Sequence, residues 1–281
     1  MHMKLLNRSF LVTFLIIALS YSHSQAQIVD DMDDESRLYA ETKQVNQFFR
    51  RFNGEEDEKG ERYYARDKEY RDPKLRKKYI SILFDASNRN VKDDLKAQFT
   101  EHVTNKTSPI VLDFHGDNWF SQVTTTFTYK GRERTFILFM KLEQEKLGYK
   151  WVIYKVYSDV FRDYMKKDTS LGKFLHPLSH ELDFMNLRKA LDDGSTATQF
   201  TIKDYRPDYL TLFLYEIKNG NLKFKTIQNV KFHFFQVPGW YFELSEFNRA
   251  GYNTGWLISD LIKVADKDKD LLRKYIYYED Q

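Results

Sequence analysis

Three short motifs in this chain combine residue types that could do acid–base or metal chemistry. In the first, Asp113, His115 and Asp117 alternate along the sequence. A continuous strand would place them on one face, as an acid–base pair or a weak metal site. Gly116 and Asp117 are also typical of a turn, which is the favoured interpretation. The alternative is an enzyme in which Asp113 or His115 is the general base.

The second motif contains two histidines four residues apart, His176 and His180. This is the spacing of paired zinc ligands on a helix. Pro177 predicts that His176 caps the helix instead of lying on its face, and the sequence indicates no third ligand. We therefore expect capping or surface roles, with no metal and no cofactor.

The third motif, Asp266, Asp268 and Asp270, imitates the start of a calcium-binding loop. Leu271 stands where such a loop needs glycine, and Tyr277 where it needs a closing glutamate. The pattern favours an acidic cluster at the N-terminus of a helix. The chain also lacks the Gly-x-Ser-x-Gly motif of nucleophile elbows.

Aromatic residues offer a different chemistry, that of binding. Exposed aromatic rings bind sugars and peptides, although an aromatic stripe at strand spacing lies more often in a core. The candidate ligand-binding residues are Trp119, Tyr149, Trp151, Trp240, Tyr252 and Trp256.

The first 26 residues resemble a secretory signal peptide. A basic start leads into an apolar run at 10–19, followed by the small residues Ser24 and Ala26. We expect cleavage before Gln27 and export to the periplasm or the cell surface. The run is about half of the roughly 20 residues that a bilayer span needs, and no later run reaches that length, so no transmembrane anchor is expected after cleavage.

Composition excludes several classes of site. The 281 residues include no cysteine, so disulfides, thiolate metal sites and cysteine nucleophiles are excluded. The net charge of +3 decreases when cleavage of the leader removes Lys4 and Arg8. A nearly neutral chain gives no electrostatic argument for binding nucleic acid.

The periodicity of apolar residues predicts helices first. One covers Leu38 to Phe52 and stops at Gly54, a second begins at Asp72 and Pro73, and a third follows Asn90. Antiparallel strands are expected after them, at 110–114, 119–129, 134–144 and 150–160.

The polar stretch 166–173 is a candidate linker, and a helix beginning at Pro177 follows it. Further strands are predicted at 209–217, 222–227, 230–237, 240–247 and 255–264, with a hairpin turn at Asn219-Gly220. Phe232 and Phe234 alternate with Lys231 and His233, so one face of that strand should meet solvent.

The two halves also resemble each other. A hairpin that ends in a strand starting with tryptophan occurs in 136–156 and again in 240–262, about 105 residues later, a spacing that suits a tandem domain. We therefore predict a signal peptide (1–26), an N-terminal domain (27–165), a linker (166–173) and a C-terminal α+β domain (174–281).

Three helices followed by an antiparallel meander resemble the secreted bacterial NTF2-like, or cystatin-like, α+β proteins. The resemblance implies helices packed on bent antiparallel sheets that enclose a pocket, and the second half departs from it by offering one clear helix. Some members are isomerases or hydro-lyases, and many others only bind. We hypothesise an exported, non-catalytic binding or scaffold protein that holds a protein, peptide or glycan of the cell envelope on a concave sheet or in an interdomain groove. The alternative is an NTF2-like enzyme that uses Asp113 or His115.

Overall fold

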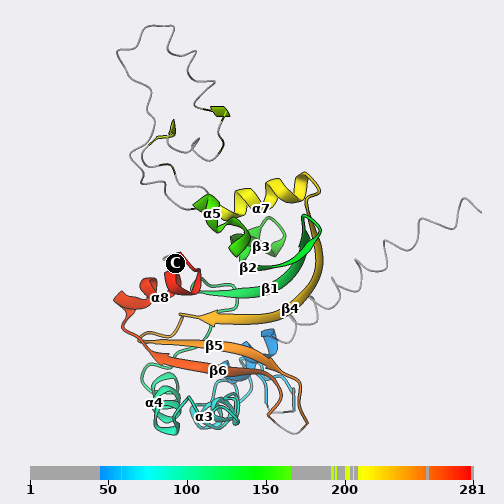
Figure 1. Cartoon of the computed structure of the whole chain (residues 1–281). Coiled ribbons are helices and arrows are strands. Elements are labelled where there is room, and N and C mark those ends of the chain that lie inside the picture. Colours follow the sequence, from blue (N-terminus) through cyan, green and yellow to red (C-terminus); the bar gives the residue numbers. More distant parts are fainter. Residues whose placement is uncertain are drawn as a thin grey trace, which may run out of the picture.

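The protein has an α+β fold built on one six-stranded antiparallel sheet (Figure 1). The computed structural model describes residues 45–57, 59–165, 191–192, 194, 200–202, 205, 208–250 and 253–279. The strands follow the spatial order β3-β2-β1-β4-β5-β6. Their bounds are β1 (Trp119–Tyr129), β2 (Arg132–Glu145), β3 (Gly148–Tyr157), β4 (Leu222–Phe234), β5 (Trp240–Phe247) and β6 (Gly255–Lys263).

The sheet joins the two halves of the chain. β1 pairs with β4 along its whole length, from Trp119 opposite Phe234 to Tyr129 opposite Leu222. The prediction of a separate sheet in each half is therefore wrong. The two strands expected at 222–227 and 230–237 are one strand, β4, which ends at Phe234 and is irregular where it passes β1. The predicted linker 166–173 lies outside the described residues.

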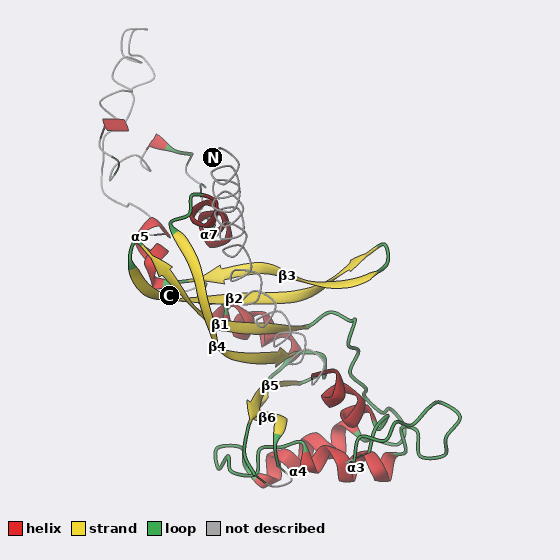
Figure 2. Cartoon of the chain, turned by 90° about the vertical axis from the view of Figure 1, so that its right-hand side faces the viewer, coloured by secondary structure: helices red, strands yellow, loops and turns green. Residues whose placement is uncertain are grey.

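The N-terminal helices form as predicted where the structure describes them, and residues 38–44 of the first lie outside the described residues. Residues 45–53 are helical, and Gly54, at φ +72°, ends the helix in the left-handed conformation that favours glycine. The Asp72 carboxylate accepts hydrogen bonds from the backbone amides of Lys74 and Leu75 and so caps α3 (Pro73–Ile82). α4 (Asp93–Val103) follows, and both helices lie at the β5–β6 end of the sheet (Figure 2).

The segment predicted as a strand at 209–217 is the helix α7 (Tyr209–Lys218). Its β-branched and aromatic residues suggested a strand, but the Asp208 carboxylate accepts from the amides of Leu210 and Thr211 and starts a helix. Phe213 then packs edge-on against Phe127 of β1. Tertiary packing thus overrides local propensity here.

Shorter helices complete the described structure. They are η1 (Asp159–Phe161), α5 (Arg162–Met165), η4 (Asp266–Asp268) and α8 (Lys269–Ile276). η4 and α8 confirm the predicted acidic cluster at a helix start, where Asp270 lies in the first turn of α8. Within the described ranges, no helix combines the length and the apolar character that a bilayer crossing requires.

The segment 110–114 forms no strand, contrary to the prediction. Its backbone groups bond to side chains instead. The Asn53 side-chain amide donates to the carbonyl of Leu112 and accepts from its backbone amide, at 2.9 and 2.8 Å. Gln236 makes the same paired bonds with Asp113. These side chains satisfy the groups that a neighbouring strand would otherwise bind.

The main core is a layer of aromatic rings between the sheet and the helices. Trp119, Phe234 and Phe242 lie opposite one another on β1, β4 and β5, and adjacent rings stack at 5.5 and 4.7 Å between centroids. Phe52 of the first helix stacks on Phe242 at 6.2 Å. Each such pair adds about 0.5–1.5 kcal/mol to the burial of its surface.

A second, smaller core lies on the opposite face of the sheet, where α8 packs. Tyr277 contacts Phe120 and Phe139, with ring centroids 4.9 Å apart in both pairs. The buried ammonium of Lys269 donates to the carbonyls of Phe235 and Val237. The C-terminal helix therefore covers part of the sheet face that the strand alternation predicted to meet solvent.

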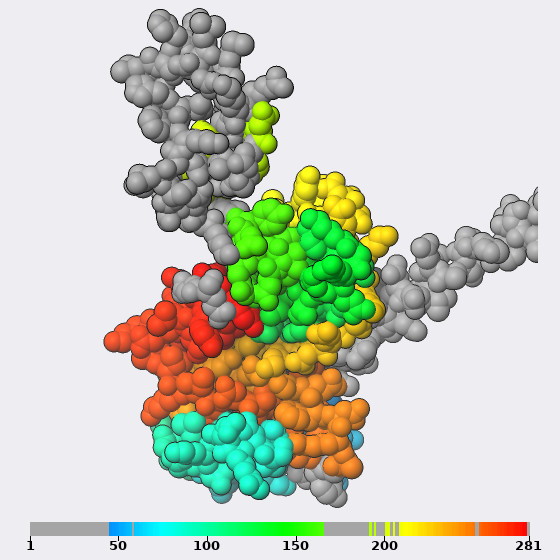
Figure 3. Space-filling view, viewed as in Figure 1, coloured from blue at the N-terminus to red at the C-terminus, as the bar shows by residue number. Residues whose placement is uncertain are grey.

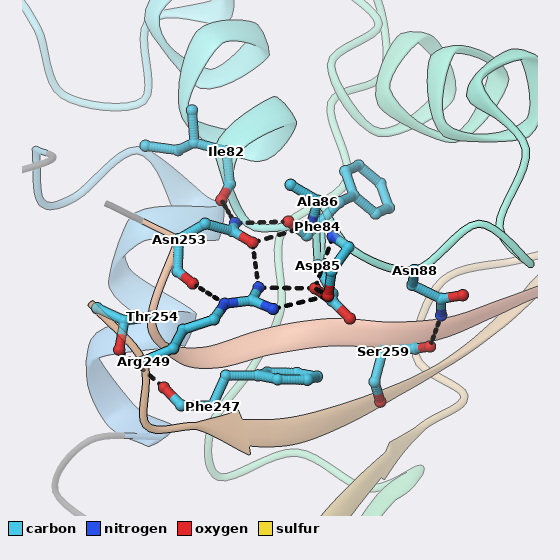
Figure 4. A network of polar contacts seen from close by, with 11 residues as sticks. Ile82, Phe84, Asp85, Ala86, Asn88, Phe247, Arg249, Asn253, Thr254 and Ser259 are labelled. Carbon is cyan, nitrogen blue, oxygen red and sulfur yellow. Dashed lines mark hydrogen bonds and ion pairs between the residues drawn. The ribbon is translucent and has the colours of Figure 1, made fainter. Parts of the chain in front are cut away.

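A network of polar contacts ties the loop after α3 to the β5–β6 hairpin (Figure 4). The Arg249 guanidinium donates to Asp85 at 2.6 Å and to Ser87 at 2.7 Å. Asn253 bonds to the backbone of Phe84 and Ala86. Burial opposes ionisation of Asp85, but the hydrogen bonds from Arg249 and Ser87 outweigh it and hold the pKa of this carboxyl below its usual value.

We predict that Arg249→Ala lowers the free energy of unfolding by about 2 kcal/mol at pH 7, because it leaves the buried Asp85 carboxylate without its cation. The contribution of the ionised Asp85 is full above the pKa of an unfolded aspartate and is lost as the pH falls through the lower folded value. The cost of Arg249→Ala should therefore shrink under strongly acidic conditions. Urea unfolding at several pH values measures both effects. The exposed Arg89→Ala is the control, and equal stabilities of the two variants at pH 7 would contradict the prediction.

Candidate functional site

The motif Asp113, His115 and Asp117 lies in the exposed loop before β1, not on a strand. The Asp113 carboxylate accepts from the backbone amide of His115 at 2.9 Å, and the amide of Gly116 donates to the Asp113 carbonyl. These are the contacts of a turn, as the favoured interpretation had it. The loop thus exposes Asp113 and His115 to solvent instead of enclosing them in the pocket that the enzyme alternative requires.

Three of the four tryptophans lie in the core. Trp119, Trp240 and Trp256 are each at most 6 % exposed. The indole of Trp119 donates to the carbonyl of Phe114, and that of Trp240 to His102 Nδ1 at 2.8 Å. The interpretation of the aromatic stripe as core is therefore confirmed for these three, and they are not exposed ligand-binding residues.

The remaining aromatic candidates lie nearer the surface. Trp151 on β3 is half-buried and packs edge-on against Trp119. Tyr149 is exposed and stacks on the His115 ring at 4.2 Å. Tyr252 lies outside the described residues. Two exposed rings that cover each other leave little open aromatic surface for a ligand.

The metal motifs find no support as sites in the described part of the chain. There, no group of three or more His, Asp or Glu side chains is placed to hold an ion. Asp266 binds the backbone amide of Gly239 and the ammonium of Lys269. His176 and His180 lie outside the described residues.

A polar groove on the outer face of the sheet, beside α8, brings together ionisable groups that are distant in sequence. It has a volume of about 290 Å³. The strand register places His233, Glu243 and Asp260 in one row across β4, β5 and β6. Directly opposite side chains on paired strands lie about 5 Å apart. α8 forms the facing wall, and its red surface borders the orange strands in Figure 3. The lining residues are Gln122, Lys231, His233, Tyr241, Glu243, Asp260, Ile262, Leu272, Tyr275, Ile276 and Tyr278.

His233 and Tyr241 form the floor of the groove. His233 is 2 % exposed, and its Nδ1 lies 2.8 Å from the Tyr241 hydroxyl and its Nε2 3.0 Å from Gln122 Oε1. Burial, with a smaller effect from Lys231, lowers the pKa of His233 to about 3. Burial also raises the pKa of Tyr241. Both side chains are thus neutral and fixed by hydrogen bonds. The expectation that this face of β4 meets solvent is wrong at His233, whereas Lys231 stays partly exposed.

Glu243 holds the centre of the groove. Its Oε1 lies 3.0 Å from the ammonium of Lys231 and accepts from the Ser259 hydroxyl at 3.1 Å. The Lys231 charge is therefore already paired within the protein. A carboxylate held by a cation and a hydroxyl is a fixed hydrogen-bond acceptor for a molecule that enters the groove.

Asp260 is the carboxyl group with the fewest partners in the row. Within the described part of the chain, its one hydrogen-bond donor is the backbone amide of Leu261, at 2.9 Å from Oδ1. Burial raises the pKa of Asp260, and the negative charge of Glu243 raises it further. The groove therefore holds a half-buried carboxyl group that no side-chain cation neutralises.

A larger cleft of about 440 Å³ lies between the first helix and the ends of β5 and β6. Gln47, Arg51 and Trp256 line it. The buried indole N–H of Trp256 has no hydrogen-bond acceptor, and its ring lies edge-on to Phe232 at 4.8 Å. Arg51 pairs with Glu56. The cleft thus offers one buried N–H group without a partner, whereas the groove holds Asp260, a carboxyl group with no paired cation.

No sequence motif marks the groove, because its members come from four strands and α8, and strand pairing is not visible in the sequence. The alternation of Lys231 and His233 was the one signal, and it was read as a solvent-exposed face. Comparison with protein-family models, with curated protein sequences and with solved structures finds no match.

We predict that His233→Gln flattens the pH dependence of stability. The unfolded chain takes up a proton near pH 6.5 and the folded protein near pH 3. The stability that neutral His233 contributes is therefore full above pH 6.5 and falls on acidification, by up to about 1.4 kcal/mol per pH unit. The variant should lose less stability than the parent between pH 6.5 and pH 4.5 in urea unfolding. The exposed His115→Gln is the control, and parallel curves for parent and His233→Gln would contradict the prediction.

Proposed function

We propose that this is an exported binding protein whose ligand site is the groove beside α8. The observation that carries the proposal is the row of His233, Glu243 and Asp260, which three paired strands hold in register. A concave site with a few fixed polar groups and an apolar wall is the usual form of a small-molecule site. Its volume of about 290 Å³ suits a small polar molecule or the end of a peptide or glycan.

The geometry favours binding over catalysis. A general base must reach the substrate and exchange its proton, whereas His233 uses both ring nitrogens in contacts with Tyr241 and Gln122. Lys231 is paired with Glu243 and supplies no free amine as a nucleophile. Asp113 and His115, the residues of the enzyme alternative, lie on the exposed loop and do not line the groove.

Export is the second part of the proposal, and the leader sequence supports it. The basic start, the apolar run and the small residues before Gln27 support a cleaved signal peptide. The resemblance to NTF2-like proteins stays a prediction, and it supports binding only by analogy of fold. The site proposed here lies on the sheet face opposite the main aromatic core.

Mass spectrometry of the protein from the cell-envelope fraction should find a mature chain that begins at Gln27. A signal peptidase recognises small residues such as Ser24 and Ala26 before the cleavage point. Changing Ala26 to a bulky residue, as in Ala26→Tyr, should leave the leader attached. Full-length chain in the parent's envelope fraction would contradict the prediction.

Native mass spectrometry tests the groove. We expect the purified mature protein, mixed with an extract of envelope small molecules, to retain a bound mass. Glu243→Gln should lose it, because the neutral amide breaks the pairing with Lys231 and removes an anionic acceptor.

Glu143→Gln is the matched control, since Glu143 is an exposed strand residue outside the groove. It should bind as the parent does, and so should Asp113→Ala and His115→Ala. Absence of any bound mass on the parent would contradict the proposal. A mass that survives Glu243→Gln and is lost in Asp113→Ala or His115→Ala would favour the loop before β1.

A further inference from the structure

We propose that the groove beside α8 selects a small organic cation, a molecule with a primary ammonium group that pairs with the Asp260 carboxylate. This inference rests on the proposed function and names the class of ligand. It comes from three features of the groove: its charges, its aromatic wall and its size.

The charges of the groove are unbalanced. Lys231 is the one cation among the described lining residues, and it is paired with Glu243 at 3.0 Å. His233 and Tyr241 are neutral. Ionised Asp260 therefore leaves one negative charge without a partner, half-buried where desolvation makes an uncompensated charge costly. A ligand that brings a positive charge removes that cost, whereas an anionic ligand increases it.

The wall opposite the carboxylates is aromatic. Tyr275 and Tyr278 of the C-terminal segment line the groove, and Tyr278 is held by stacking on Tyr157 at 4.2 Å between centroids. A cation over a tyrosine ring is stabilised by about 0.5–2 kcal/mol. An ammonium group that lies between the carboxylates and the tyrosine rings is therefore favoured over a hydroxyl group in the same place.

The size of the groove limits the ligand. About 290 Å³ is at the lower end of the range for small-molecule pockets. A diamine or an amino sugar fits this volume, whereas a folded protein segment does not enter it. Larger molecules would bind through a terminal amine.

Isothermal titration calorimetry on the mature protein compares two pairs of probes that differ by amine against hydroxyl: putrescine with 1,4-butanediol, and glucosamine with glucose. We expect at least one amine to bind ten-fold or more tightly than its hydroxyl counterpart. Asp260→Asn should weaken the binding of that amine at least ten-fold and leave the affinity for its hydroxyl counterpart unchanged. The exposed Asp94→Asn is the control for loss of one negative charge and should bind as the parent does.

The pH dependence is a second readout. Only the ionised Asp260 pairs with an ammonium, so amine binding should displace a proton and strengthen as the pH rises through the pKa of this group. The groups that face Asp260 are Glu243, which raises this pKa together with burial, and Lys231, which lowers it. Tyr241 also interacts with it, Tyr278 lines the same groove, and both stay protonated because burial raises their pKa values. The binding enthalpy should therefore vary with the ionisation enthalpy of the buffer for the parent and not for Asp260→Asn.

The outcomes separate the two proposals. Asp260→Asn is expected to fold, since burial and the charge of Glu243 oppose ionisation of Asp260 and the amide carries no charge. Equal affinities for amine and hydroxyl probes, or an amine affinity unchanged by Asp260→Asn, would overturn the ammonium class. The groove would remain a binding site if Glu243→Gln still abolished the mass seen in native mass spectrometry. If no amine bound and no such mass existed, both proposals would be overturned.

Discussion

The pairing of β1 with β4 determines the arrangement of the rest of the structure. It joins strands from the two halves of the chain, and its register sets what faces each side of the sheet. With Trp119 opposite Phe234, the aromatic rings of β1, β4 and β5 stack on the helix side. The same register places Phe120 opposite His233 on the other side. A slip of one residue would exchange the two faces, burying Lys231 and exposing the rings, so the aromatic core and the polar groove depend on one another.

The groove also depends on α8, which covers only part of the outer face. Tyr277 anchors the helix on Phe120 and Phe139, and Lys269 binds it to two carbonyls at the end of β4. This contact excludes water from His233 but leaves Glu243 and Asp260 at the margin of the helix. His233 is therefore buried and Glu243 and Asp260 are partly exposed, because α8 covers the first and ends beside the other two.

The sequence predicted most of the helices and strands but few of the long-range contacts that join them. Asp72, Gly54 and the strand 119–129 carry signals that act within a few residues, and the structure has each of them. The strand prediction for 209–217 is wrong because it gave composition more weight than the capping signal of Asp208. The strand prediction for 110–114 is wrong because the hydrogen-bond partners of this segment, Asn53 and Gln236, lie far away in sequence. The tryptophans stayed candidates for both core and ligand binding, because hydrophobic periodicity does not say which of two faces is covered.

The groove has no signature in the sequence. Its ionisable groups are single residues on separate strands, and none belongs to a motif. Their chemistry arises only when the sheet forms, because pairing brings Glu243 beside Asp260 and Lys231 neutralises only one of the two carboxylates. Two like charges on adjacent strands cost stability. That cost persists in the free protein and would fall on binding of the proposed cation, so the repulsion that weakens the fold locally would strengthen the binding of a positively charged ligand.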